Sequence, residues 1–404
     1  MMRLEDACEL IVDCPHSTAR DEGKGFPLIR TPNIGRGRFL LENVHRVSES
    51  VYNKRNARAV PKDDDIILAR EAPAGNVAII KNGVKMCLGQ RTVLLRPNKE
   101  VVNPDFLTYF LLAPEQQYGL LGTANGATVA HVNIPTIRNL KIKLPPLKTQ
   151  ERIGKILSAY DDLIENNQRQ IKLLEEAAQR LYKEWFVDLR FPGHENTKIT
   201  DGVPEGWEYK PIFDVFDFVR GRSYTSNELS DSTGVLMVNL KNIRAFGGYN
   251  RNAEKRFVGQ FKDNQILSAG DVIMGVTDMT QERRLVGHVA LVPNMGETMI
   301  FSMDLIKLIP KRTDNLFLYS AMIFGGVSKR ISPLANGVNV LHLKPEAIMG
   351  VEMLIPNDKV VCRYHSQMAP VFSEIETLQK QCDIAAEARD RLLSKLMNGE
   401  IRGG

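Results

Sequence analysis

Residues 148–186 carry apolar side chains at alternating spacings of four and three. The seam of this pattern consists of Ile153, Leu157, Tyr160, Ile164, Asn167, Ile171, Leu174, Ala178, Leu181 and Trp185. Glu, Gln, Lys and Arg fill most of the outer positions, and no Pro or Gly lies within residues 155–186. A sustained seven-residue repeat is typical of a helix that packs against another helix. The pattern predicts a helical spacer about 55 Å long at 1.5 Å per residue.

A second seam of the same kind lies near the C-terminus. It consists of Val361, Tyr364, Met368, Val371, Ile375, Leu378, Cys382, Ala385, Arg389, Leu392 and Leu396. We predict that the two helices pair as an antiparallel coiled coil within the chain. Asn167 and Arg389 interrupt the seams, as polar residues that fix the register often do. The alternative is a pair of amphipathic helices that pack on separate domains.

Residues 1–146 have the pattern of a mixed α/β unit. Short β-prone runs are separated by Gly, Pro and Asn turns and cover residues 26–30, 65–69, 76–80 and 92–95. One helix is predicted from Pro104 to about residue 121, since Pro is favoured in the first turn. A last strand over 140–144 ends at two prolines. Residues 191–209 have no period and are predicted to form a linker.

The first unit recurs in the second half of the chain. Similar strings pair residues 4–13 with 212–221, 65–70 with 271–276, 75–80 with 287–292, 104–112 with 315–323, and 126–145 with 337–356. In the last pair an offset of 211 places Gly126 on Gly337, Val129 on Val340, His131 on His342 and Pro145 on Pro356. The same offset carries Ile153 onto Tyr364, so both seams keep their phase. A duplicated unit of globular domain plus long helix follows.

These patterns together predict an α+β fold of two mixed α/β globular domains with a pseudo-two-fold internal repeat. An antiparallel two-helix spacer separates the domains. The predicted boundaries are 1–146 for the first domain, 147–190 for the central helical spacer, 191–209 for the linker, 210–356 for the second domain and 357–404 for the C-terminal helix. The two domains differ most in their basic loops, which predicts an asymmetric, two-part target.

Composition and charge add the kind of partner. The 404 residues have an ordinary globular composition, no apolar run of membrane-spanning length and no signal-peptide pattern, so we expect a cytoplasmic protein. The five cysteines have no metal-type spacing. Residues 1–146 contain 20 basic and 15 acidic residues, whereas the rest is balanced. Basic windows at 30–58 and 219–262 indicate a polyanion bound at defined places. Ordinary solvated charge is the alternative for either window alone.

The sequence resembles the specificity subunit of type I restriction-modification systems over essentially its whole length. Four stretches carry the resemblance: GATVAHVNI…LPPLKTQERIGKILSAYDDLIENN, LYKEWFVDLRFPG, VPEGWEYKPIFDV and DCPHST at 13–18. It implies two target-recognition domains that read the two parts of a split DNA sequence. It also implies assembly with two adenine-N6 methyltransferase subunits and with ATP-dependent restriction subunits, which would hold S-adenosylmethionine, ATP and Mg²⁺. The second domain has VRGRSY in place of DCPHST, which fits a different target in each half.

Candidate DNA-contacting residues follow the predicted strands. Arg suits guanine edges and phosphates, and Asn or Gln suits adenine. The base-reading candidates are Arg30, Asn33, Arg36, Arg38, Arg70 and Glu71 in the first domain and Arg220, Arg222, Tyr224, Asn239, Lys241, Asn242 and Arg244 in the second. The phosphate candidates are Lys54, Arg55, Arg58, Arg251, Lys255, Arg256, Arg283 and Arg284. Each of them alone is equally compatible with a solvated surface charge.

The sequence contains none of the catalytic motifs that we sought. It has no GxxxxGK[ST] loop and no Asn/Asp-Pro-Pro-aromatic tetrapeptide of amino-methyltransferases. Asp63, Asp64 and Asp65 are interpreted as a polar turn, with a metal site as the alternative. His131 and His342 are interpreted as a repeated structural hydrogen bond, so we expect neither metal nor cofactor in this chain. The leading prediction is a non-catalytic subunit that binds double-stranded DNA. The alternatives are a structural coiled-coil rod with protein-binding heads and a stand-alone DNA-modifying enzyme with unrecognised motifs.

The end of the central helix suggests a second role. Tyr182, Trp185 and Phe186 bring three aromatic side chains close together. We predict that methyltransferase subunits dock along the helices and at these residues. The alternative is that the aromatic side chains pack beneath their own globular domain.

Overall fold

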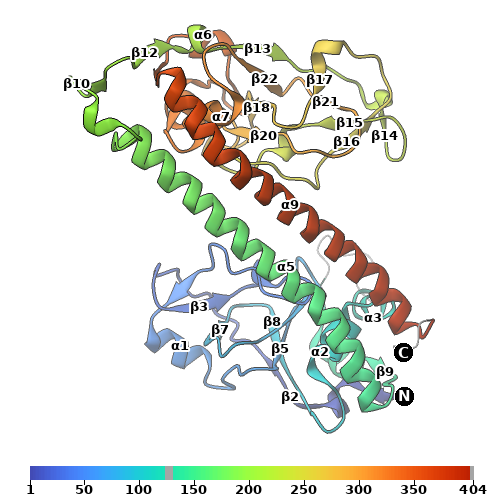
Figure 1. Ribbon diagram of the computed structural model, residues 1–404. Helices are drawn as coiled ribbons and strands as arrows, with labels where there is room; N and C mark the ends of the chain where they lie inside the picture. Colours follow the sequence, from blue (N-terminus) through green and yellow to red (C-terminus); the bar gives the residue numbers. More distant parts are fainter. Residues whose placement is uncertain (123–130, 401–404) are drawn as a thin grey trace. The chain divides into compact units, whose positions relative to one another are not determined.

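The computed structural model describes residues 1–122 and 131–400. It divides into two compact units. Unit 1 is Met1–Arg169 with Gln379–Gly404, and unit 2 is Gln170–Leu378. Two long helices, α5 (Leu147–Tyr182) and α9 (Asp358–Met397), contribute to both units (Figure 1). Two positions of the predicted repeat, Gly126 and Val129, lie outside the described residues.

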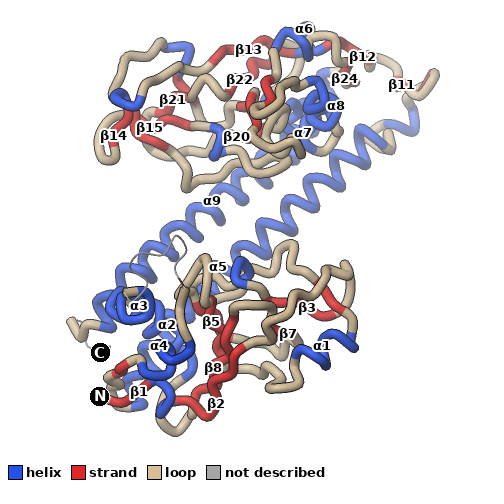
Figure 2. The backbone as a smooth tube through the Cα atoms, turned by 180° about the vertical axis from the view of Figure 1, so that it is seen from behind, coloured by secondary structure: helices blue, strands red, loops and turns tan. Residues whose placement is uncertain are grey.

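Unit 1 contains two small sheets that share an interior. A four-stranded antiparallel sheet has the order β2-β8-β5-β6, with bounds Cys8–Asp13, Thr92–Pro97, Ile66–Ala69 and Val77–Ile79. A three-stranded sheet has the order β4-β3-β7, with bounds Arg46–Val47, Phe26–Ile29 and Cys87–Leu88. A third pair joins β1 (Met2–Arg3) to β9 (Lys141–Ile142). Figure 2 labels strands β2, β5 and β8 of the first sheet and β3 and β7 of the second.

The described residues of unit 1 also form four shorter α-helices: α1 (Glu49–Arg55), α2 (Pro104–Leu112), α3 (Pro114–Leu121) and α4 (Ile134–Asn139). The single helix predicted over 104–121 is wrong, because the chain breaks at Ala113. Pro114 lacks an N–H and disfavours helical geometry in the preceding residue, and Ala113 accordingly has φ −64° and ψ 145°. Apolar side chains of α2 pack with those of β5 and β8 in one core.

Unit 2 repeats this topology. Its four-stranded sheet has the order β13-β22-β18-β20, with bounds Phe216–Arg220, Leu305–Pro310, Val272–Gly275 and Val289–Leu291. Its second sheet has the order β14-β16-β15-β21-β17, with bounds Leu229–Ser230, Lys255–Phe257, Val235–Val238, Met299–Phe301 and Ile266–Leu267. In both units the second sheet contains one parallel pair, β3 with β7 and β15 with β21. The predicted internal repeat is therefore confirmed.

Two further features of unit 2 correspond to features of unit 1. The strand pair β12 (Glu208–Pro211) and β24 (Glu352–Ile355) matches β1 and β9, and α7 (Asn315–Ile323) matches α2. A further pair, β19 (Thr277–Asp278) with β23 (Leu341–His342), lies just after the end of β18. The short elements α6 and α8 are Ile212–Val215 and Val327–Ile331.

The long helices pack on each other within each unit. In unit 1 the Asn167 Nδ2 donates to Gln381 Oε1 at 3.0 Å, and Arg389 pairs with Asp161. The residue numbers therefore run in opposite directions, as an antiparallel pair requires. In unit 2 Ile171 of α5 forms one buried cluster with Ile375 and Leu378 of α9. The predicted polar positions Asn167 and Arg389 both find partners on the facing helix.

The segment predicted as a linker, 191–209, is attached to unit 2. Its Phe191 and Trp207 are buried, with ring centroids 4.7 Å apart. Between them, β10 (Ile199–Thr200) and β11 (Val203–Pro204) form a small hairpin. The segment packs on unit 2 through two buried aromatic side chains, and this arrangement needs no periodic apolar face.

Candidate nucleic-acid interface

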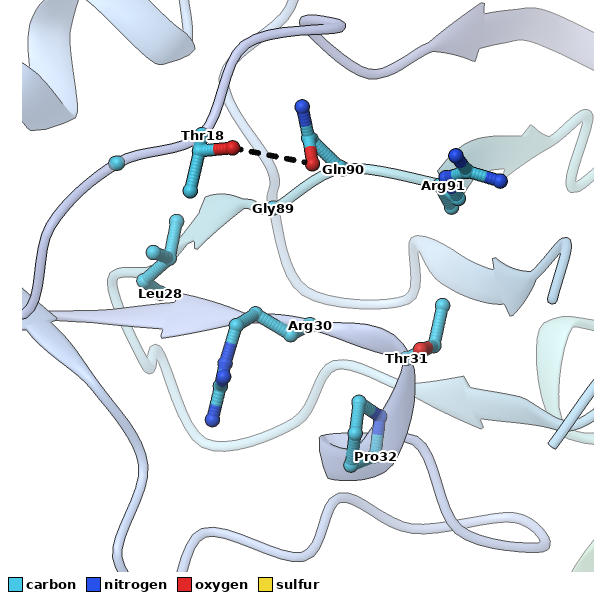
Figure 3. A pocket seen from close by; sticks show the side chains of 9 residues that line it. Thr18, Leu28, Arg30, Thr31, Pro32, Gly89, Gln90 and Arg91 are labelled. Atoms are coloured by element: carbon cyan, nitrogen blue, oxygen red, sulfur yellow. Dashed lines mark hydrogen bonds between the residues drawn. The ribbon is translucent and has the colours of Figure 1, made fainter. Parts of the chain in front are cut away.

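An open hollow of about 230 Å³ lies at one edge of the three-stranded sheet of unit 1 (Figure 3). Because β3 and β7 run parallel, Arg30 and the turn Gly89–Arg91 leave the sheet at the same edge. The DCPHST stretch lies across the hollow from Arg30 and contributes Thr18 to its lining (Figure 3). Gln90 Nε2 donates to His16 O at 2.7 Å, and Thr18 Oγ1 donates to Gln90 Oε1 at 3.3 Å. The edge thus collects arginine, amide and hydroxyl groups, which are the groups that contact bases and phosphates.

A second hollow of about 350 Å³ shares Gln90 and Arg91 with the first and is also lined by His16, Arg70 and His131. Charged side chains form a continuous network beside it. Arg70 Nη1 donates to Asp13 Oδ1 at 3.0 Å, and Arg70 Nε donates to Val132 O at 2.9 Å. Arg70 is buried, so these contacts hold its guanidinium in one orientation.

His131 continues the network. Arg70 Nη2 lies 2.9 Å from His131 Nε2, and His131 Nδ1 lies 2.9 Å from Glu71 Oε1. Arginine can only donate, so His131 Nε2 accepts and Nδ1–H donates to the carboxylate. Burial, together with the positive charges of Arg70 and Arg91, lowers the pKa of His131 and favours this neutral imidazole.

Arg91 ends the network at the surface. Glu71 pairs with Arg91, whose side chain is still 53% exposed. A chain of contacts therefore runs from Asp13 through Arg70, His131 and Glu71 to Arg91, which lines both hollows. The predicted base readers Arg70 and Glu71 therefore contact other side chains of unit 1, whereas Arg91 keeps an exposed side chain beside both hollows.

Three other candidates of unit 1 are exposed and three are engaged inside the unit. Arg36, Lys54 and Arg58 are exposed. Asn33 is buried, its Oδ1 accepting from Arg30 N at 3.1 Å and its Nδ2 donating to Leu40 O at 3.2 Å. The engaged arginines are Arg55, which donates to Leu88 O at 2.6 Å and Ser17 O at 3.0 Å, and Arg38, which pairs with Asp162 of α5 at 2.7 Å. Asn33, Arg38 and Arg55 therefore make contacts inside unit 1 and are not part of the candidate interface.

The candidates of unit 2 divide in a similar way. Arg220, Lys241, Arg244 and Arg284 are exposed; Arg222, Tyr224, Arg251, Lys255, Arg256 and Arg283 are half-buried. Four of these arginines have acidic partners: Arg220 pairs with Glu346 at 2.6 Å, Arg222 with Glu228 at 3.3 Å, Arg256 with Glu297 at 2.7 Å, and Arg284 with Glu282. Lys255 has an aromatic partner, since its Nζ donates to the hydroxyl oxygen of Tyr224 at 3.0 Å. The local ion pairs lower the net positive charge of this surface.

Asn239 and Asn242 are buried. Asn242 Oδ1 accepts from Asn239 N at 2.8 Å and Asn242 Nδ2 donates to Asn250 O at 2.9 Å, which repeats the contacts of Asn33. Asn239 Nδ2 donates to Ala253 O at 2.6 Å. These asparagines cap the turn after a strand and leave no amide group for a base. The repeated Asn-Ile at 33–34 and 242–243 is the sequence signal of this turn.

His16, Thr18, Gln90 and Arg91 are among the residues of the hollows that the sequence did not identify as DNA-contacting. DCPHST contains the first two and was visible as a motif. Gln90 and Arg91 follow Gly89 after the two-residue strand β7, and Arg91 has a φ of +63°. The tertiary structure alone brings them to DCPHST.

Residues 1–176 and 204–367 match the family described as Type I restriction modification DNA specificity domain. The chain belongs to this family.

Two similar relatives are the Type I restriction enzyme MjaIX specificity subunit of Methanocaldococcus jannaschii and the Type I restriction enzyme HindI specificity subunit of Haemophilus influenzae. The first is 26% identical over 375 residues, covering 90% of this chain and 83% of the relative. The second is 19% identical over 441 residues, covering 92% and 94%. The crystal structure of the type I restriction-modification S subunit from M. genitalium matches with a TM-score of 0.58 and 14% identity, covering 98% of this chain and 95% of that one. That likeness supports the fold.

The aromatic residues at and just after the end of α5 are not an exposed patch. Tyr182, Trp185 and Phe186 are buried at 6%, 6% and 7% exposure. Phe186 lies 5.0 Å from Tyr364 and 5.1 Å from Phe317, measured between ring centroids, all within unit 2. The structure therefore agrees with the alternative interpretation, in which these aromatic side chains pack beneath their own globular domain.

No group of three His, Cys, Asp or Glu side chains that could hold a metal occurs among the described residues. The three consecutive aspartates do form polar contacts around a turn: Asp63 accepts from Gly83 N, Asp64 pairs with Lys81 and Lys99, and Asp65 pairs with Arg96. Within the part of the chain that the structure describes, no helix is long and apolar enough to cross a membrane. His131 has the side-chain bonds described above, whereas His342 is exposed and pairs through its backbone with Asn336.

Proposed function

We propose that the chain is the DNA specificity subunit of a type I restriction-modification complex and that each unit binds one part of a bipartite, asymmetric duplex target. One observation carries this proposal. The same strand edge is built twice, by the parallel pairs β3–β7 and β15–β21, and the two edges carry different polar side chains. Two equal scaffolds with unequal edges suit a target whose two parts have different sequences.

The contacts to DNA divide into two kinds. In unit 1, Arg30, Gln90 and Arg91 line the hollow and suit base edges in a groove. Exposed cations outside the hollow suit phosphates, which position a protein on the duplex without reading sequence. These cations are Arg36, Lys54 and Arg58 in unit 1 and Arg220, Lys241, Arg244 and Arg284 in unit 2.

Catalysis belongs to partner subunits in this proposal. The chain directs two adenine-N6 methyltransferase subunits and ATP-dependent restriction subunits to the target, and S-adenosylmethionine, ATP and Mg²⁺ bind to those partners. The support is that the relatives are named as specificity subunits of type I restriction enzymes. Since Tyr182, Trp185 and Phe186 are buried, the methyltransferase subunits would bind the solvent-facing sides of α5 and α9, where Leu163 and Ile384 are exposed.

Adenine methylation across the genome tests this function. Cells that contain the partner methyltransferase would be compared with and without the gene for this chain. We expect a split, asymmetric motif to be methylated only when the chain is present. Unchanged methylation, together with no salt-dependent DNA binding by the purified complex, would contradict the proposal.

A further inference from the structure

The backbone hydrogen bonds of the two units identify equivalent positions without any sequence alignment. Gly89 N donates to Ile29 O at 2.7 Å in unit 1, and Ser302 N donates to Val238 O at 2.8 Å in unit 2. Two residues later, Arg91 O accepts from Arg70 N at 2.8 Å, and Asp304 O accepts from Val276 N at 2.9 Å. The turn Gly89–Arg91 therefore corresponds to Ser302–Asp304.

The residue after the strand end also corresponds, because Val132 N donates to Arg70 O and Leu343 N donates to Val276 O, both at 2.8 Å. This places Glu71 on Thr277. In unit 1 Glu71 holds Arg91, and in unit 2 Thr277 Oγ1 donates to Asp304 Oδ1 at 3.1 Å. Each unit thus has one charged side chain at the edge, oriented by the same neighbouring position.

The charge of that side chain is reversed between the units. Unit 1 presents Gln90 and Arg91, and unit 2 presents Met303 and Asp304 at the same two places. Met303 is 56% exposed and Asp304 is partly exposed. Phosphates repel a carboxylate, so a carboxylate at a DNA-facing edge suits a donor on a base. Aspartate accepts from an exocyclic amino group, whereas arginine donates to the two acceptors of guanine.

Building on the proposed function, we propose that this turn selects the base chemistry of each half of the target. Arg91, with Gln90 beside it, reads an acceptor edge such as that of guanine in the half bound by unit 1. Asp304 reads an amino group, that of cytosine or adenine, in the half bound by unit 2. Arg70, His131 and Glu71 are positioning residues for Arg91, and Thr277 is the positioning residue for Asp304.

The test uses the chain assembled with its partner methyltransferase subunits and a pool of duplexes randomised in sequence. Bound duplexes are sequenced for the native complex and for Arg91→Gln, Arg91→Lys, Asp304→Asn and Asp304→Glu. Arg91→Lys keeps the charge but loses the two-pronged fork, and Asp304→Glu keeps the acceptor but moves it. Asp201→Asn serves as a control because Asp201 is exposed on the β10–β11 turn, which belongs to neither strand edge.

We expect each variant to lose discrimination at one position by about tenfold or more, with the Arg91 and Asp304 variants affecting different halves of the motif. The control should select the native motif. The inference is overturned if the variants select the native motif, if binding to all sequences weakens equally, or if both positions alter the same half. Should Arg91→Gln or Asp304→Asn unfold the chain, the charge-conserving variants decide by the same criteria.

A native complex that selects no split motif would contradict the proposed function itself. A native complex that does select one, with variants that leave it unchanged, would contradict only the role of this turn. The two failures are therefore distinguishable in a single selection.

Discussion

Tyr109 donates its hydroxyl hydrogen to Asp161 Oδ2 at 2.6 Å in the interior of unit 1. The bond joins α2 of the globular part to α5, and Arg389 of α9 pairs with the other oxygen of Asp161. Burial, followed by the charge of Asp161, raises the pKa of Tyr109, which keeps the phenol protonated as a donor. Gly37, with a φ of +98°, packs against the same carboxylate. A Cβ at this position would lie only 2.6 Å from Asp161 Oδ2, so there is no space for a larger residue.

Replacement of Tyr109 by Phe is expected to destabilise unit 1 by about 2 kcal/mol, because a buried hydrogen bond to a charged group is lost while the ring remains. Urea unfolding of the native chain and the variant measures this difference. Tyr118→Phe is the matched control, since Tyr118 is 79% exposed, and it should leave the unfolding midpoint unchanged. Equal midpoints for Tyr109→Phe and the native chain would show that the bond contributes little.

Replacement of Trp185 by Ala tests whether the aromatic cluster is part of the core. Loss of a buried indole should lower the free energy of unfolding by about 3 kcal/mol or more. Val187→Ala, two residues away at a side chain 55% exposed, is the control and should have little effect. Differential scanning calorimetry follows both. A Trp185→Ala variant of native stability that no longer binds the methyltransferase would instead support a docking role.

The exposed lysines of the two units should contribute to DNA binding through phosphates. We expect Lys54→Ala and Lys241→Ala each to weaken binding on all sequences alike and to reduce the slope of log K against log salt by about 1. Fluorescence anisotropy from low to moderate salt measures the slope. Lys198→Ala, at another exposed position, should not change it. A change of sequence preference on mutation of Lys54 would mean that it reads a base.

His288 is predicted to make unit 2 sensitive to acid. Burial lowers its pKa, against the opposing effect of hydrogen bonds to the backbone of Arg283 and Phe246. The unfolded chain then binds this proton more readily than the folded chain, so stability should fall as the pH drops below about 6.5.

The melting temperature between pH 5 and pH 7.5 measures the effect, and His288→Gln should give a flatter profile than the native chain. The exposed His342 provides a control, and His342→Gln should keep the native slope. An identical slope for His288→Gln would assign the acid sensitivity to other groups.

Several parts of the fold could be predicted because they depend on local periodicity. The heptad seams identified both long helices and the polar positions Asn167 and Arg389, since a repeated spacing specifies which side chains share a face. The break at Ala113 was missed, although Pro114 is its cause, because the apolar pattern continues across the break and dominated the prediction.

The candidate site was predicted less completely. The search for basic and amide residues at strand ends identified Arg30 and Arg36. It also identified Asn33 and Arg55, which instead donate hydrogen bonds to backbone carbonyls inside unit 1. Arginine and asparagine donate equally well to a backbone carbonyl and to DNA, so residue type does not separate the two roles. Arg91 was missed because its neighbours in space, Glu71 and His131, lie far from it in the sequence.

The sequence by itself determined the duplication, the two long helices and the seams along which they pack, because periodic burial of apolar side chains is encoded in the spacing of the residues. Only the tertiary structure decided which polar side chains face solvent and which satisfy buried backbone groups. It also decided that the equivalent turns carry Arg91 in one unit and Asp304 in the other. The reason is that a hydrogen bond depends on distance and direction between groups, and only the folded chain specifies these for residues far apart in sequence.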